Sequence, residues 1–480
     1  MTLASAQKNL TTDGPTDGQS DATASLFPLP LTALEQFLWD CESPHSPMVI
    51  RVVIRFRGTL DSEEFLRCLK VVLARHPLLT CRLTAHQGIA AWIPCSSDES
   101  RSQISLTMQS GSVLDSETGR LQCAIDLRNS PALRVTIRVF PDGVKVILDG
   151  HHVATDGNGM RQMVTEWLHL YHCEQTSSPH RWSVTDPDRL LSRHRLPRPA
   201  TVEPTKPGEA LRNFWYSIRG RTARLQRLKD RNPETAVDES FAVEILASAV
   251  QRQMISERLH HWRIPLNDLL LASSMRTFAA LVPSRRNHRI TVLNPTELRR
   301  PSDRALPAAN RFGLAFLRRR PEECRNASLF LSGIYDQMTY VRSRYVGADF
   351  VHALDGLRQK PWLVRMARRL GWFVPTMQVT CLGDVGRGAK RLMPVVDGYQ
   401  CAAGLQVISV TGFAPFAEHV PISIASAETG NSLALTVRSS PRYLTPEQTQ
   451  QFARTLLTDL CEYPFGRSGA AVVTDGEERC

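Results

Sequence analysis

The sequence contains no run of about 18 to 20 apolar residues, the length that an α-helix needs to cross a lipid bilayer. Residues 1–25 are rich in Thr, Ser, Asp and Gly and contain no apolar core of the kind found in secretory signal peptides. We therefore predict a cytoplasmic protein with a disordered tail at residues 1–25. A second loose tail is expected at residues 467–480.

The cysteines have no spacing of the kind that binds a metal ion or forms a disulfide framework. The 11 cysteines are scattered from Cys41 to Cys480, and no Cys-x-x-Cys occurs. An odd number of cysteines without regular spacing indicates reduced thiols in a cytosolic protein. The sequence thus predicts no disulfides and no metal site.

Acidic residues are the minority among the charged residues. The chain has 58 Lys and Arg against 47 Asp and Glu, which gives a net charge of +11 at pH 7. A basic surface favours nucleic acid, anionic membrane, phosphorylated cofactors or acidic carrier proteins as partners. Arginine clusters such as residues 318–320 are by themselves typical of solvated faces. No zinc finger or aromatic RNA-binding motif accompanies them, so the sequence disfavours nucleic acid.

The length of 480 residues exceeds the size at which a single hydrophobic core stops growing, and this predicts two domains. An apolar fraction of 42% and a charged fraction of 22% are typical of a globular protein. Residues 173–210 are rich in Pro, Ser, Thr and charge, and we interpret them as a linker. It would join an N-terminal lobe, residues 26–172, to a C-terminal lobe, residues 211–466.

Local patterns predict several elements in the first half. Residues 49–57 alternate apolar and polar side chains, which indicates a half-buried strand. Asp61 is the expected N-cap of the helix that follows, and His76-Pro77 ends it. Residues 132–140 and 143–149 are β-rich runs joined by a Pro-Asp-Gly turn, so they predict a hairpin.

A strong helix follows the hairpin, because apolar residues recur with helical spacing from Met160 to Tyr171. The second half has a similar mixture of strands and helices. Strands are expected at 241–247, 289–294, 376–382, 405–411, 421–427 and 432–438. Helices are expected at 252–262, 266–281, 322–344, 351–370 and 445–461.

Two histidines stand where the second hairpin strand ends and the next helix is about to begin. They open the run His-His-Val-Ala-Thr-Asp-Gly, residues 151–157. A histidine is the natural general base at neutral pH, and at such a junction a substrate can reach His152. Asp156 can orient the base, cap the helix or pair with a buried arginine. Gly157 removes a side chain where a ligand or another strand would need a close approach.

The same residues also have structural interpretations. An Asp before a helix most often serves only as its N-cap, and a lone His in an extended segment is usually a satisfied structural residue. His152 and Asp156 can also ligate a metal ion together, but no third or fourth ligand is indicated by spacing. The complete His-His-x-x-x-Asp-Gly string is more specific, since it arises by chance on the order of once in a hundred such chains.

This string resembles the motif of the chloramphenicol acetyltransferase-like superfamily, above all of the condensation domains of nonribosomal peptide synthetases and their free-standing acyltransferase relatives. Further segments across most of residues 26–465 resemble the same family. In the first half they are residues 28–39, 56–82, 126–127 and 131–136. In the second half they are residues 294–299, 310–313 and 380–384, where such proteins carry Pro-x-x-x-Arg, Asn-x-x-Gly and Ser-Asn-x-Gly.

The resemblance implies an α/β fold of the two-layer α+β kind. It would have two chloramphenicol acetyltransferase-like lobes, each a mixed sheet flanked by helices, with a central channel between them. It implies an acyltransferase in which His152 takes the proton of an acceptor hydroxyl or amine as this attacks an acyl thioester, without an acyl-enzyme intermediate. Asp156 would form a structural ion pair, for which Arg299 is our candidate partner. Gly157 completes the motif, and His151 is expected to support the site.

The resemblance also suggests which residues line the channel: Thr380, Asn310 and Gly313. Thr380 is a candidate donor to the oxyanion, although Ser409 or Thr411 would serve equally well. Cys381 stands where the family often has Asn, and this departure concerns the acceptor side of the channel. The Asp-Phe-Gly-Trp-Gly box of the plant alcohol acyltransferases is absent, which excludes that branch.

The expected co-substrate is a pantetheine thioester that is not bound permanently. The sequence contains no carrier segment of the Gly-Gly-x-Ser type and no adenylation module, so the donor would be acyl-CoA or a phosphopantetheinyl carrier protein made elsewhere. Both donors are acidic, which suits the positive net charge. Residues 358–373 form a basic amphipathic segment that can lie on anionic membrane or pack against the second lobe. Packing is the commoner arrangement.

Two other functions are compatible with the sequence. One is a non-catalytic binding or scaffolding module that keeps the condensation-like fold. The other is a metal hydrolase that uses His151, His152 and Asp156. The intact motif favours the acyltransferase.

Overall fold

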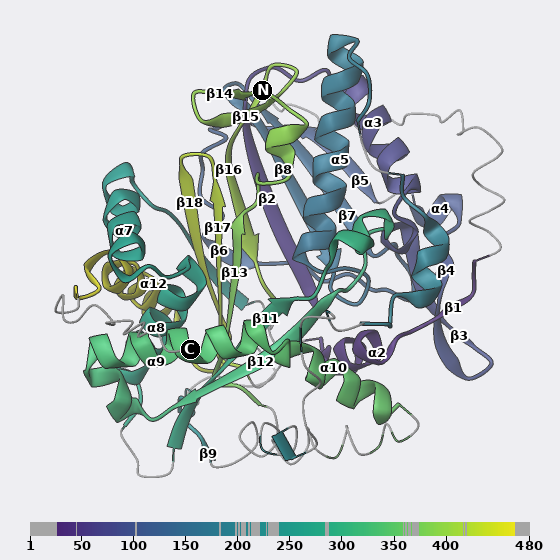
Figure 1. Ribbon diagram of the computed structural model, residues 1–480. Helices are drawn as coiled ribbons and strands as arrows, with labels where there is room; N and C mark the ends of the chain where they lie inside the picture. The colour runs from purple at the N-terminus through teal and green to yellow at the C-terminus, as the bar shows by residue number, and fades with distance from the viewer. Residues whose placement is uncertain are drawn as a thin grey trace, which may run out of the picture.

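A computed structural model describes residues 26–465, except for residue 45, residues 101–102 and 182–183, most of 197–239, residues 284–287, most of 359–373, and residues 416 and 418–419. The predicted tails, and most of the predicted amphipathic segment 358–373, lie outside the described residues. Two large sheets and their helices form two lobes that lie side by side (Figure 1).

The sheet of the first lobe has seven strands, and its middle strands are the predicted strand and hairpin. The order is β14-β15-β16-β2-β8-β7-β5, and only the pair β5–β7 is parallel. In chain order the strands are β2 (Val49–Arg57), β5 (Ile104–Met108), β7 (Leu133–Phe140), β8 (Gly143–His151), β14 (Val395–Val396), β15 (Tyr399–Ala402) and β16 (Leu405–Phe413).

Two helices cover this sheet, α3 (Ser62–Ala74) and α5 (Gly157–Thr176). Asp61 caps α3 as predicted, since its carboxylate accepts the Glu64 backbone N–H at 3.2 Å. The helices pack through aromatic rings, and the centroids of Phe65 and Trp167 are 4.2 Å apart. The indole N–H of Trp167 donates to the Phe65 carbonyl at 2.9 Å, so the buried polar atom is satisfied.

A small sheet and a short helix lie beside this lobe. The sheet has the order β1-β4-β3, with β1 (Leu29–Pro30), β3 (Cys81–His86) and β4 (Ile89–Pro94). Helix α2 (Ala33–Cys41) begins with a capping box in which Thr32 and Glu35 exchange hydrogen bonds. Buried Arg193 then binds Glu35 through two nitrogens.

All six strand predictions for the second half are confirmed to within three residues, one of them (405–411) as β16 in the first lobe and five in the sheet of the second lobe. The order of this second sheet is β12-β11-β13-β17-β18-β10-β6, and β9 (Arg221–Thr222) pairs with β11 off this path. The strands are β6 (Gly119–Leu121), β10 (Ser240–Leu246), β11 (His288–Glu297), β12 (Phe312–Arg319), β13 (Met377–Asp384), β17 (Ile422–Thr429) and β18 (Ser432–Ser439).

The helices of this lobe follow most of the predicted ranges, but the one expected at 351–370 starts at Val346 and already ends at Gly356. They are α7 (Ala249–Trp262), α8 (Leu266–Ala279), α9 (Ala327–Ser343), α10 (Val346–Gly356) and α12 (Pro446–Glu462). The helix expected at 322–344 starts later, after a 3₁₀ turn at Pro321–Arg325, because the Asn326 side chain caps α9 by accepting the Leu329 N–H. No helix among the described residues is long and apolar enough to span a membrane.

Each lobe takes strands from the other half of the chain. β16 pairs with β2 in the first lobe, and β6 pairs with β10 in the second. Part of the segment 173–210, which we predicted to be a linker, belongs to the folded lobes, because α5 continues to Thr176 and Leu190 is fully buried. The two sheets therefore do not correspond to two continuous stretches of sequence.

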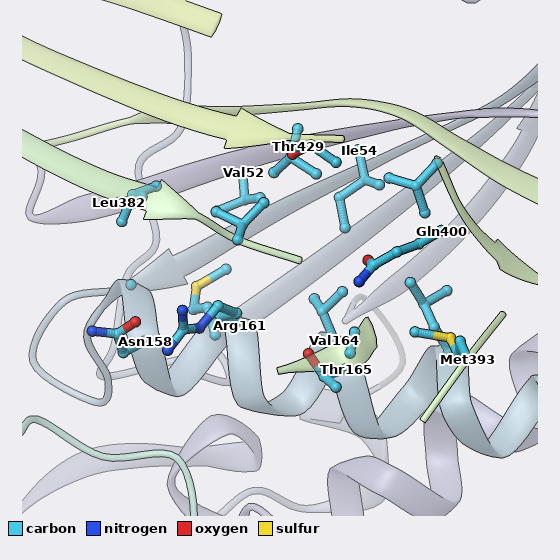
Figure 2. Close-up of a pocket in the computed structure, with 17 residues that line it drawn as sticks. Val52, Ile54, Asn158, Arg161, Val164, Thr165, Leu382, Met393, Gln400 and Thr429 are labelled. Carbon is cyan, nitrogen blue, oxygen red and sulfur yellow. The ribbon is translucent and has the colours of Figure 1, made fainter. Parts of the chain in front are cut away.

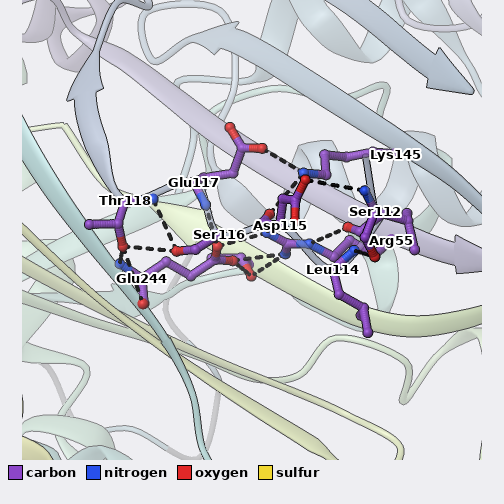
Figure 3. Close-up of polar contacts among 11 residues, drawn as sticks. Arg55, Ser112, Leu114, Asp115, Ser116, Glu117, Thr118, Lys145 and Glu244 are labelled. Carbon is purple, nitrogen blue, oxygen red and sulfur yellow. Dashed lines mark hydrogen bonds and ion pairs between the residues drawn. The ribbon is translucent and has the colours of Figure 1, made fainter. Parts of the chain in front are cut away.

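A buried ion pair joins the lobes. Arg55 on β2 binds Glu244 on β10 through two nitrogens, at 2.7 and 2.8 Å, and both side chains are at most 1% exposed. Glu244 also accepts the Glu117 backbone N–H at 2.7 Å and the Thr411 hydroxyl at 2.6 Å. Figure 3 shows how these groups converge, with Lys145 reaching Glu117 alongside. Every oxygen of the buried carboxylate thus has partners.

Candidate active site

His152 lies at the predicted junction, because β8 ends at His151 and α5 begins at Gly157. Its Nδ1 is 3.1 Å from the carbonyl oxygen of Thr155. A carbonyl oxygen only accepts hydrogen bonds, so Nδ1 carries the proton and the lone pair is on Nε2. The ring stacks on Phe312 with centroids 5.0 Å apart and an angle of 26° between the planes. The imidazole is thus held in one orientation and one tautomer.

Burial sets the protonation state of this histidine. Desolvation lowers the pKa of His152 below its ordinary value of 6.5, and the charge of Asp156 and the hydrogen bond to Thr155 oppose this only in part. At neutral pH the imidazole is therefore uncharged, which is the form that can accept a proton.

His151 turns to a different set of partners. Its Nε2 is 2.9 Å from the Glu42 carboxylate, and its Nδ1 accepts the Val153 backbone N–H at 3.3 Å. Glu42 also accepts the Met48 N–H, and the Met48 carbonyl accepts the His152 N–H at 2.7 Å. Glu42 therefore helps to hold the motif in place, and sequence reasoning missed it because nothing in its local pattern distinguishes it from a surface glutamate.

Asp156 combines two of the roles that its position allowed. Its carboxylate caps α5 by accepting the Gly159 N–H at 2.8 Å and forms an ion pair with Arg299 at 2.8 Å. The backbone N–H of Arg311 donates to the same carboxylate at 2.7 Å. The ring nitrogen of His152 is oriented by the Thr155 carbonyl instead.

Two of the predicted channel residues make contacts that indicate a positioning role. The Asn310 amide donates to the carbonyls of His152 and Val153, at 2.8 Å each, and so fastens the motif loop. Gly313 lies against the backbone of Gly347, where a methyl group would clash with its carbonyl oxygen. This glycine allows β12 and α10 to pack closely.

The three candidate oxyanion donors differ in their hydrogen bonding. The hydroxyls of Thr380 on β13 and Ser409 on β16 are buried and have no hydrogen-bond partner among the described residues. The Thr411 hydroxyl already donates to Glu244. The first two hydroxyls therefore have hydrogen-bonding capacity that the described residues do not use, and the third is engaged.

An apolar cavity of about 60 Å³ begins where the motif ends. Figure 2 shows it between α5 and the strands of both halves of the chain. A methyl group on Gly157 would lie 2.9 Å from the Leu382 side chain, so the glycine lets α5 approach this wall. The lining residues are Val52, Ile54, Gly157, Asn158, Met160, Arg161, Val164, Thr165, Leu168, Leu382, Val385, Ala389, Met393, Gln400, Val407, Val410 and Thr429.

The metal-hydrolase interpretation finds no ligand set in the part of the chain that the structure describes. No group of three or more His, Cys, Asp and Glu side chains there could hold a metal ion. His151 and His152 face Glu42 and the Thr155 carbonyl respectively.

No model of a known protein family matches the sequence. Two curated proteins are similar to parts of it. Nonribosomal peptide synthetase 5 of Gibberella zeae is 22% identical over 277 residues, or 56% of this chain, and tyrocidine synthase 3 of Brevibacillus parabrevis is 27% identical over 123 residues, or 25% of this chain. The chain spans only 2% of the length of each relative.

Solved structures are similar over nearly the whole chain. The first condensation domain of the calcium-dependent antibiotic synthetase aligns with a TM-score of 0.63 and 13% identity, covering 91% of this chain and 96% of that one. The starter condensation domain of rhizomide synthetase, in complex with C8-CoA and Leu-SNAC, aligns with a TM-score of 0.61 and 12% identity, covering 93% and 96%.

A third similar structure is polyketide synthase associated protein 5 from Mycobacterium tuberculosis, with a TM-score of 0.58 and 15% identity, covering 92% of this chain and 98% of that one. These structures share two lobes built on mixed sheets with the present chain. The chain therefore has the condensation-domain fold, and the predicted resemblance and fold class are both confirmed.

Proposed function

We propose that the chain is an acyltransferase that moves an acyl group from a pantetheine thioester to a hydroxyl or amine acceptor. The observation that carries this proposal is the environment of His152. Its Nδ1–H is bound to the Thr155 carbonyl, and burial lowers its pKa, so Nε2 presents a basic lone pair at neutral pH. These are the properties that a general base needs.

In the proposed reaction Nε2 of His152 takes the proton of the acceptor O–H or N–H as the acceptor attacks the thioester carbonyl. A tetrahedral oxyanion forms, and an unpartnered hydroxyl, on Thr380 or Ser409, donates a hydrogen bond to it. The C–S bond then breaks, and the imidazolium returns the proton to the departing thiolate. No covalent bond to the protein is formed.

The remaining motif residues position the base. Asp156 and Arg299 pair beneath the motif loop, and Asn310 holds the carbonyls of His152 and Val153. His151 is held by Glu42 and has no free ring nitrogen, so its proposed role is support.

The donor is proposed to be acyl-CoA or an acyl carrier protein. The structure of the rhizomide synthetase starter domain with C8-CoA supports this, because that domain has the same fold. The net charge of +11 supports it too, since both donors are acidic.

The test is product analysis by mass spectrometry after incubation with a mixed acyl-CoA panel and small alcohols and amines. The panel is repeated with acyl-loaded carrier protein. His152→Ala is the critical variant, and His86→Ala, at an exposed histidine on β3, is its matched control. We expect transfer by the wild type and by His86→Ala, and a loss of about a hundredfold or more in His152→Ala. If the wild type forms no product with either donor, the proposal is rejected in favour of a non-catalytic scaffold.

A further inference from the structure

One charged side chain lies on the face of α5 that lines the apolar cavity. The residues of this face lie on successive turns of the helix, and they are Gly157, Asn158, Met160, Arg161, Val164, Thr165 and Leu168. Opposite them lie Val52 and Ile54 of β2 and Val407 and Val410 of β16. Arg161 therefore places a positive charge in a cavity whose walls are otherwise mostly apolar.

Arg161 makes no hydrogen bond and no ion pair within 4 Å among the described residues. The three carboxylates that act on it electrostatically are each paired with another cation. Arg299 binds both Asp156 and Glu297, and Lys390 binds Asp384. Partial removal of a guanidinium from water, without a hydrogen bond or an ion pair in return, costs free energy of folding. An anion that binds to Arg161 would therefore stabilise the protein.

A second polar group in the cavity wall also lacks a partner. The hydroxyl of Thr429 on β17 is buried and has no hydrogen-bond partner among the described residues, and the residue is 2% exposed. Figure 2 shows Thr429 on the strand side of the cavity, across from the helix that carries Arg161. A substrate polar group would satisfy this hydroxyl as well.

The position of Arg161 along the cavity indicates which part of a ligand it meets. It follows Gly157 by four residues, a rise of about 6 Å along α5, so it lies at the end of the cavity near the motif. In Figure 2 it lies beside Asn158, whereas Met393 and Gln400 mark the other end. A ligand would thus place its anionic group at the end of the cavity near the motif and its apolar group farther along the cavity.

The size of the cavity indicates an apolar group that it can hold. A volume of about 60 Å³ corresponds to about four water-sized groups at ~15 Å³ each. A short aliphatic chain of a few carbons fits this space.

We propose that Arg161 binds a carboxylate of the substrate and that the cavity takes the short apolar group beside it. The substrate class is an acid whose carboxylate is close to its reacting atom. It is either an α-amino or α-hydroxy acid acceptor, or a malonyl-type donor with a short alkyl branch. The reaction of this substrate rests on the function proposed above, but its binding does not.

Two matched pairs of ligands separate these sources. Norvaline is compared with norvalinamide for the acceptor, and ethylmalonyl-CoA with butanoyl-CoA for the donor, because each pair differs at the carboxylate. Binding is measured by calorimetry on the His152→Ala protein. The critical variant on this background is Arg161→Met, and the control is Arg57→Met, at an exposed arginine on β2.

In one of the two pairs we expect the carboxylate-bearing member to bind at least about tenfold more tightly, which is the typical effect of one charge-assisted hydrogen bond. Arg161→Met should abolish this preference, Arg161→Lys should keep part of it, and Arg57→Met should leave it intact. The pair that shows the preference identifies the substrate as acceptor or donor.

Thermal unfolding distinguishes ligand binding from a structural role of Arg161. Since the cation has no direct partner in the part of the chain that the structure describes, Arg161→Met should keep or raise the melting temperature, whereas a structural arginine would lower it. No carboxylate preference in either pair, or a preference that survives in Arg161→Met, would overturn the inference. A preference that depends on Arg161, in a protein that transfers no acyl group, would sustain it while rejecting the proposed acyltransferase.

Discussion

At the scale of single residues, a backbone carbonyl orients the candidate base, and a carboxylate does not. The Thr155 carbonyl fixes the tautomer of His152 without adding a negative charge, so desolvation dominates and the pKa falls. Asp156 is occupied by Arg299, by the first turn of α5 and by the Arg311 N–H. The base is therefore ready in its neutral form, and the acidic residue of the motif maintains the shape of the loop.

This arrangement predicts the pH dependence of transfer. The neutral imidazole is the active form, and burial holds its pKa below 6.5, so kcat/KM should stay level at neutral pH and fall only as the pH drops below 6.5. Phe312→Ala should raise the pKa of His152 toward 6.5, and with it the midpoint of the acid side of the pH profile, because the stacked ring keeps water from His152. Initial rates between pH 5 and 8 would measure both effects. A wild-type midpoint at or above 6.5 would contradict the assignment.

At the scale of elements, the backbone contact between β12 and α10 determines where Phe312 lies. Gly313 follows Phe312 in β12 and meets Gly347 of α10 with no space for a side chain on either residue. The strand can therefore lie close to the helix and present Phe312 to the imidazole. The packing of two elements in the second lobe thus reaches the candidate base on β8.

We predict that Gly313→Ala destabilises the fold by about 1–3 kcal/mol, because the new methyl group meets backbone atoms that cannot rotate away. Gly356→Ala is the matched control on α10, since its methyl group would enter open space. It should be neutral or stabilising by up to about 1 kcal/mol. Urea unfolding measures both values, and equal effects of the two substitutions would refute this account of the contact.

At the scale of the whole molecule, exchanged strands and one buried ion pair hold the lobes together. β16 and β6 extend the sheets of opposite lobes, and Arg55 and Glu244 meet between those sheets. Burial raises the pKa of Glu244, but the hydrogen bonds and charge of Arg55 outweigh it, and the pKa lies below the usual 4.5. The stability from this pair is therefore present above pH 4.5 and is lost as the pH falls through the lowered pKa.

Removal of the charge should show how much the fold depends on this pair. Glu244→Gln leaves Arg55 buried without a counter-charge and should cost about 3–5 kcal/mol. Glu64→Gln breaks the ion pair of Glu64 with Arg67, whose side chain is 50% exposed, and should cost less than about 1 kcal/mol. Denaturant unfolding at pH 7 compares the two variants. A Glu244→Gln protein as stable as the Glu64→Gln control would show that the buried pair is unimportant.

The sequence by itself determined the features that depend on neighbouring residues. The strand at 49–57 forms as predicted, but it is buried on both faces and not half-buried, because Arg55 on the expected polar face pairs with Glu244 in the interior. Helical spacing and the cap at Asp61 appear where they were predicted, and His152 lies at the expected junction of strand and helix. Residue spacing alone sets these features, because side chains two, three or four residues apart share a face of a strand or a helix.

Only the tertiary structure decided which distant residues meet. Glu42 binds His151, Phe312 stacks on His152, and Arg161 has no hydrogen bond or ion pair with the described residues because the nearby carboxylates bind other cations. The first two contacts join residues more than a hundred positions apart. The environment of Arg161 depends on several carboxylates and on the cations that bind them. No local pattern carries that information, since such contacts form only when the strands and helices pack and bring the two halves of the chain together.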